Sequence, residues 1–263
     1  MVDVPPCGLA HSAGMTNVSD LTGLPAGPPP APEGAGSRLA ARVSWAGALT
    51  GLAGVACYAA GVLLPGSAPG PDAATTQVAA FVVNQRGSLL AGFALQLTAL
   101  LFLLWFLGQL RTLVAAAGGA GVPLATAMVA GWVVLVTMVG VSMLPAMAIT
   151  WRGAAATSPG LVRLAWDMQI LGTYAMPATA AMVSVAAPSV VILRYKILPW
   201  WLAVLGAAVV AANVAELAGL FSRHGALAGG FAYGIGQILW VIWVAAASVS
   251  MAWRCRAGAK PAR

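Results

Sequence analysis

Long apolar stretches separated by short polar breaks fill the sequence from position 43 to position 253. A helix needs about 20 consecutive apolar residues to cross the hydrocarbon core of a bilayer. The stretches that meet this length are 43–64, 88–110, 124–149, 163–193, 198–221 and 227–253. The sequence therefore predicts an all-α polytopic membrane protein, built as a bundle of six transmembrane helices.

The scarcity of charged residues excludes a soluble fold. Asp, Glu, Lys and Arg make up 7% of the chain and hydrophobic residues 60%, whereas a soluble domain carries about 25% charged residues. The net charge of +7 comes from cations near the ends of the apolar stretches, not from a basic run. Nucleic acid is therefore not an expected partner, and the lipid bilayer is.

The chain is expected to divide into three parts. Residues 1–37 are rich in Pro and Gly and show no apolar periodicity, which predicts a disordered cytoplasmic tail. The six-helix domain then covers 38–255, and 256–263 form a short basic cytoplasmic tail. The fourth apolar stretch is over-long and contains Pro177 and Pro188, so we expect a kinked or strongly tilted helix there.

The loop between the first two spans has a pattern of its own. Asp72 can cap a short helix that carries Val78, Phe81 and Val82 on one side and ends near Asn84. An amphipathic helix in this place is typical of a segment that lies in the membrane interface. We expect it at the outer interface.

The distribution of Lys and Arg predicts the orientation. If the N-terminus is cytoplasmic, nine cations fall on the inner side and four on the outer side, as the positive-inside rule favours. We therefore expect a multi-pass protein of the cell membrane with both termini in the cytoplasm. The expected inner aromatic belt consists of Trp45, Trp200, Trp201 and Trp253, and the outer belt of Trp151 and Trp166.

Metal and cofactor chemistry has no support in the residues. His11 and His224 are far apart in the sequence, and Cys7, Cys57 and Cys255 show no ligand spacing. We predict no metal site and no cofactor.

Only two acidic residues, Asp167 and Glu216, fall inside the apolar stretches. A charge at the membrane centre costs about 2.5 to 3.5 kcal/mol on insertion scales, so such residues face a partner or a cavity. In the predicted topology both lie in the outer third of the membrane. We expect an outward-facing polar pocket with Arg163, Arg223 and His224 at its rim. The candidate pocket residues are Asp167, Glu216, Asn213, Gln96, Gln169, Tyr174, Tyr233, Gln237 and Tyr58.

Three functions stay open on these residues. The pocket can bind a small amphiphile or a cation. Alternatively, Asp167 and Glu216 can act as the acid and base of a membrane enzyme with a lipophilic, isoprenoid-like substrate. In an accessory or structural subunit, the polar groups only join helices, and Arg163 pairs with Asp167. The sequence shows no broken helix at the midplane and no carboxylate in the inner half, which argues against a transport path.

Two small-residue motifs, Gly47-x-x-x-Gly51 and Gly230-x-x-x-Gly234, predict close helix contacts. Packing within the bundle is the expected use. A contact between copies of the chain through either face is the alternative.

Three segments carry a resemblance: NQRGSLLAGFALQLTALLFLLWFLGQLR at 84–111, LVRLAWDMQILGTYAMPATA at 161–180 and LRYKILPWWLAVLGAAVV at 193–210. They resemble a family of uncharacterised actinobacterial multi-pass membrane proteins. The likeness covers roughly residues 38–253 and departs at Trp200, where the family often has Arg. It implies six helices and no established activity. It also implies that Asp167, in the Trp-Asp step, is a candidate functional residue.

Overall fold

The computed structural model of the chain describes residues 44–258, apart from 71, 154, 156, 176 and 220–229. In this part of the chain all regular elements are helices, and no strand occurs. In order they are α2 (Trp45–Leu63), α3 (Thr75–Asn84), α4 (Arg86–Ala115), α5 (Gly121–Arg152), α6 (Pro159–Ile170), the π-helix η3 (Leu171–Ala175), α7 (Ala178–Tyr195), α8 (Trp200–Gly219) and α9 (Gly230–Gly258). The predicted all-α fold is confirmed.

Six helical segments are long and apolar enough to cross a membrane, which confirms the six predicted spans. They are Trp45–Leu63, Arg86–Ala115, Gly121–Arg152, Pro159–Tyr195, Trp200–Ala218 and Gly234–Arg256. The chain is therefore a multi-pass membrane protein. The predicted tail 1–37 and the last five residues lie outside the described residues, and α9 continues to Gly258, beyond its predicted end.

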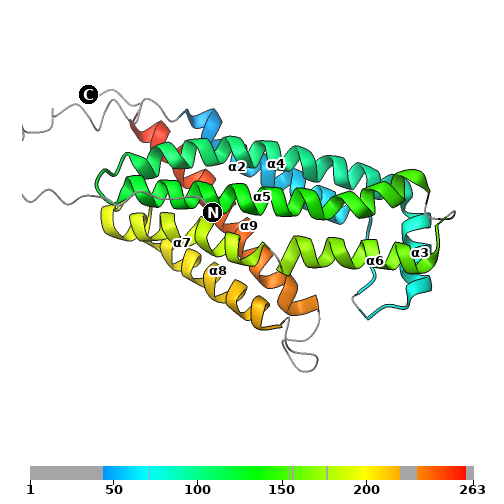
Figure 1. Cartoon of the computed structure of the whole chain (residues 1–263). Coiled ribbons are helices and arrows are strands. Elements are labelled where there is room, and N and C mark those ends of the chain that lie inside the picture. Colours follow the sequence, from blue (N-terminus) through cyan, green and yellow to red (C-terminus); the bar gives the residue numbers. More distant parts are fainter. Residues whose placement is uncertain are drawn as a thin grey trace, which may run out of the picture. The chain divides into compact units, whose positions relative to one another are not determined.

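The spanning helices pack in a closed ring. α2 packs on α4 and α9, α4 on α5, α5 on α7, α7 on α8, and α8 on α9. At one end of the long helices α4 and α5, the helices α3 and α6 pack against each other (Figure 1). We name this the α3 end. α8 ends well short of it, so the α3 end is built mainly from α3 to α6 (Figure 1).

The fourth span, Pro159–Tyr195, is interrupted between α6 and α7. The π-helix η3 follows Ile170, and α7 begins only after Pro177, whose ring has no N–H to continue the helical ladder. The predicted kink is confirmed. π-helical turns inside α-helices frequently occur at functional sites.

The short helix α3 exists as predicted, but Asp72 does not cap it. Ala74 occupies the N-cap position, and its backbone N–H donates to the Oε1 atom of Gln77 at 3.2 Å. The side chain of Gln77, in the first turn, therefore accepts a hydrogen bond from the backbone N–H of the N-cap residue. Asp72 lies two residues before the N-cap position. The predicted apolar face is present, because Val78 and Val82 are buried.

The aromatic residues differ from the predicted belts at one position. Trp45, Trp200, Trp201, Trp253 and Trp151 are exposed, as belt residues must be. Trp166 is only 7% exposed, because Phe81 of α3 packs edge-to-face on it with ring centroids 5.5 Å apart. It belongs to the interior of the α3 end.

The glycines of α2 pack inside the bundle, as expected. A Cβ atom at Gly51 would lie 2.7 Å from the Phe106 ring of α4, and one at Gly61 would lie 2.6 Å from the backbone carbonyl oxygen of Gly92. The Gly47 and Gly51 face is therefore occupied by neighbouring helices of the same chain.

The closest approach of α5 to α7 gives the first prediction. A Cβ atom at Gly131 would lie 2.9 Å from the backbone nitrogen of Ser184 and 3.0 Å from the carbonyl oxygen of Ala180. Because backbone atoms cannot turn aside, we expect Gly131→Ala to lower the free energy of unfolding by about 1 to 3 kcal/mol. A lower Tm by circular dichroism in detergent checks this.

Gly140→Ala, in the same helix, is the matched control. Its Cβ atom would meet only Leu100 Cδ1 at 3.7 Å, an ordinary contact, so the Tm should stay unchanged or rise. Equal melting of the two variants would contradict the close α5–α7 contact.

Candidate functional site

A partly open cavity of about 260 Å³ lies between α2, α4 and the fourth span, toward the α3 end. The loop after α2 lines one side of it with Pro65, Gly66, Ala68 and Pro69. The apolar lining residues include Phe81, Leu89, Phe93, Trp166 and Ile170, and the polar ones are Tyr58, Gln96, Gln169 and Thr173. The last turn of α6 and the start of η3 supply Gln169 and Thr173, so the broken helix forms part of the cavity wall.

The polar groups of the cavity wall are neutral. Among the described residues that line it, none carries a charge. The Oε1 atom of Gln169 and the indole Nε1 of Trp166 are buried and have no hydrogen-bond partner within the described part of the chain. An unpaired buried donor or acceptor costs about 1 to 3 kcal/mol.

Thr173 holds η3 against α5. Its hydroxyl lies 3.1 Å from the hydroxyl of Ser142, at hydrogen-bond distance. Gly172 makes the approach possible, because a Cβ atom there would lie 2.3 Å from the Cβ atom of Ser142. This contact fixes the broken segment at the cavity wall.

The first predicted carboxylate, Asp167, forms the expected ion pair. Arg163 Nε lies 2.8 and 2.9 Å from the two carboxylate oxygens of Asp167. A second guanidinium nitrogen of Arg163 donates to the backbone carbonyl of Ala73, just before α3. Since the Asp167 side chain is 39% exposed, such a pair contributes about 0 to 1 kcal/mol. Its evident role is to hold α6 against the start of α3.

The second predicted carboxylate, Glu216, is buried between α8 and α9. Glu216 is 1% exposed and Asn213, one turn earlier, is 3% exposed. A Cβ atom at Gly236 of α9 would lie 2.5 Å from Glu216 Oε2 and 3.2 Å from Asn213 Nδ2. The glycine thus leaves room for the carboxylate. Glu216 Oε1 has no hydrogen-bond partner among the described residues.

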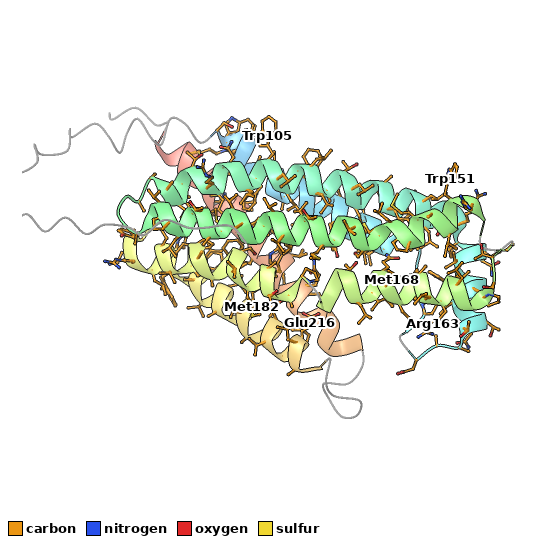
Figure 2. All side chains as sticks on the ribbon, viewed as in Figure 1. Trp105, Trp151, Arg163, Met168, Met182 and Glu216 are labelled. Atoms are coloured by element: carbon orange, nitrogen blue, oxygen red, sulfur yellow. The ribbon has the colours of Figure 1, made fainter. Side chains whose placement is uncertain are left out.

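The structure divides the residues of the predicted pocket into three groups. Tyr58, Gln96 and Gln169 meet at the cavity. Asn213 and Glu216 form a second group against Gly236, and Asp167 with Arg163 forms the third. Arg163 lies near the α3 end and Glu216 nearer the middle of the bundle (Figure 2).

The other predicted site residues contribute less. Gln237 is half-buried on α9. The side chains of Tyr174 and Tyr233, and the predicted rim residues Arg223 and His224, lie outside the described residues. Sequence reasoning missed Thr173, because a threonine in an apolar helix carries no signal. It also missed the role of Trp166, which its place near a helix end assigned to the interface.

Comparison of the chain with models of protein families, with curated proteins and with solved structures gave no match. Within the described residues, no group of three or more His, Cys, Asp or Glu side chains is arranged to hold a metal ion. Function must therefore be inferred from the geometry of the cavity and of the two carboxylates.

Glu216 gives a prediction about stability. We expect Glu216→Gln to leave the Tm unchanged or to raise it, because a buried carboxylate with an unpaired oxygen costs more free energy than a neutral amide of the same shape. Thermal unfolding in detergent at pH 7 measures this. Asp167→Asn is the comparison, and should lower the free energy of unfolding by at most about 1 kcal/mol. A fall of several degrees for Glu216→Gln would mean that the carboxylate has a stabilising partner within the chain.

Proposed function

We propose that this protein binds a small uncharged amphiphile in the cavity between α2, α4 and the fourth span. The observation that carries the proposal is the lining of the cavity, which is largely apolar and contains the four uncharged polar side chains Tyr58, Gln96, Gln169 and Thr173. Apolar walls with a few placed polar groups are typical of small-molecule sites. A volume of about 260 Å³ suits a small molecule or one end of a larger lipid.

The cation alternative and the enzymatic alternative both depend on the carboxylates. Neither Asp167 nor Glu216 is among the described residues that line the cavity, and Asp167 is engaged with Arg163. An acid-base pair needs both groups at one substrate. The accessory role needs no ligand at all. A cavity lined by apolar and uncharged polar side chains favours a bound molecule over an accessory role.

The proposal includes a location. We infer that the protein lies in the cell membrane with both termini in the cytoplasm, so that the cavity faces outward. The support is the count of nine inner against four outer cations. On the resemblance of its three segments alone, we also propose that the chain belongs to the actinobacterial family named above.

Native mass spectrometry of protein released from gentle detergent tests the binding proposal. Wild type should carry an adduct of discrete mass, and Gly234→Leu should lose it. Gly234 lines the cavity, and a Cβ atom there would meet nothing within 4 Å, so the leucine enters the cavity without striking the backbone. Gly108→Leu is the control, because Gly108 is exposed on α4 and is equally open. It should keep the adduct.

A second pair of variants tests the polar contacts. Gln96 lines the cavity, whereas Gln109, on the same helix, lies beside Gly47 and outside the cavity. Gln96→Leu should weaken retention of the adduct about tenfold, the loss expected for one hydrogen bond of about 1.4 kcal/mol. Gln109→Leu should not weaken it. Adduct retention that is the same in wild type, Gly234→Leu and Gln96→Leu would exclude this cavity as the site.

Reporter fusions test the orientation separately. Green fluorescent protein fused after Arg263 should fluoresce, because it folds in the cytoplasm. Alkaline phosphatase fused to a chain that ends at Pro69 should be active, because it folds only on the outer side. The reverse pattern would mean that the protein has the opposite orientation and that the cavity faces the cytoplasm.

A further inference from the structure

A second hollow lies at the opposite end of the bundle, on the outer surface of α8 and α9. It is an open groove of about 1030 Å³. Its lining includes the small side chains Ala245, Ala246 and Val249 of α9, which we call the floor, and the indoles of Trp201 and Trp253. The indole Nε1 of Trp243 donates to the carbonyl of Leu202 at 3.0 Å and joins the two helices beneath it. The groove shares no described residue with the cavity of the proposed function.

The shape and lining of the groove suit an acyl chain. The small side chains of the floor and the two large indoles give the groove a largely apolar lining. Trp253 is 71% exposed and Trp201 43% exposed, so both indoles are accessible at the groove. Tryptophan is enriched at the level of lipid headgroups, because its ring is apolar and its N–H is polar.

Two arginines lie at the end of the groove, and they do different things. Arg254 holds the turn between α7 and α8, since its guanidinium donates to the backbone carbonyls of Lys196 and Ile197. The guanidinium carbon of Arg256 instead lies over the Trp45 ring, 5.6 Å from its centroid. No hydrogen-bond acceptor among the described residues contacts it. The contact with the ring therefore leaves the N–H groups of Arg256 without an acceptor in the described part of the chain, and a phosphate is a group that a guanidinium binds through two hydrogen bonds.

Among the described residues, the charges at this end of the bundle are all positive. Arg194 and Lys196 lie at the same end as Arg254 and Arg256. The carboxylates of the described residues, Asp72, Asp167 and Glu216, all lie elsewhere. An anionic headgroup is therefore attracted, whereas the ammonium group of a zwitterionic lipid meets no carboxylate of the described part of the chain. A second copy of the chain would bring the same cations against these, which disfavours it as the occupant.

We propose that this groove binds an anionic phospholipid, with one acyl chain along Ala245, Ala246 and Val249 and the phosphate on Arg256. Basic pockets between transmembrane helices are known to take such headgroups. The site is independent of the ligand cavity, so either proposal can fail without the other.

Lipid titration of the delipidated full-length protein, read by native mass spectrometry, tests the proposal. The probes are phosphatidylglycerol and phosphatidylcholine with identical acyl chains. Wild type should bind phosphatidylglycerol about tenfold more tightly. Arg256→Gln should weaken phosphatidylglycerol about fivefold and should weaken phosphatidylcholine less, because the ammonium group of that lipid already offsets the attraction between its phosphate and the cation. Arg152→Gln is the matched control, because Arg152 is an exposed cation in the last turn of α5, at the other end of the bundle. It should keep the full preference.

Two further variants separate the headgroup from the chain. Arg256→Lys keeps the positive charge but lacks the planar guanidinium group. It should recover part of the preference for phosphatidylglycerol that Arg256→Gln loses. Ala245→Phe fills the floor and should weaken both lipids equally. Equal binding of the two lipids by wild type, or an equal loss in Arg152→Gln and Arg256→Gln, would overturn the proposal. So would a dimer in wild type that Ala245→Phe converts to a monomer, because the groove would then belong to a second copy.

Discussion

Close contact at glycines decides which helices of this protein become neighbours. In lipid, a helix gains little by burying apolar side chains, because the acyl chains around it are as apolar as its neighbours. Contact between backbones must supply the attraction. Gly61 meets the backbone at Gly92, Gly131 meets it at Ser184, and Gly206 accommodates the hydroxyl of Ser189. These contacts join α2 to α4, α5 to α7 and α7 to α8, and they account for half of the ring.

Glycines at helix contacts also explain the position of η3 and the burial of Glu216. Gly172 brings η3 onto Ser142, so the broken segment of the fourth span is held at the cavity wall instead of relaxing into a continuous helix. Gly236 leaves the space that the Glu216 carboxylate occupies. A larger residue at either position would close the feature. The cavity and the buried acid are therefore built by the packing of the bundle.

The sequence predicts the spans well and their facing poorly, for one physical reason. A run of apolar residues and a scarcity of charge are sufficient to identify a transmembrane helix, and Pro177 is sufficient to expect a kink. The sequence carries no such signal for which side of each helix points toward lipid and which toward the interior of the bundle. Lipid and protein interior are both apolar, so no stripe of polar residues marks the outer side. Asp167 and Glu216 were therefore expected in one pocket, although one holds Arg163 and the other faces Gly236. Trp166 was assigned to the surface for the same reason.

Helix α9 contributes to the cavity, to the surroundings of Glu216 and to the groove. Gly234 lines the cavity, Gly236 faces Glu216, Ala245 and Ala246 form the floor of the groove, and Arg256 ends it. An α-helix with an intact hydrogen-bond ladder moves as a rigid rod, at 1.5 Å per residue. A displacement of α9 that closed the cavity at Gly234 would therefore also move Gly236 relative to the carboxylate. Since Gly236 lies directly beside the carboxyl group of Glu216, such a displacement would change the surroundings of this acid.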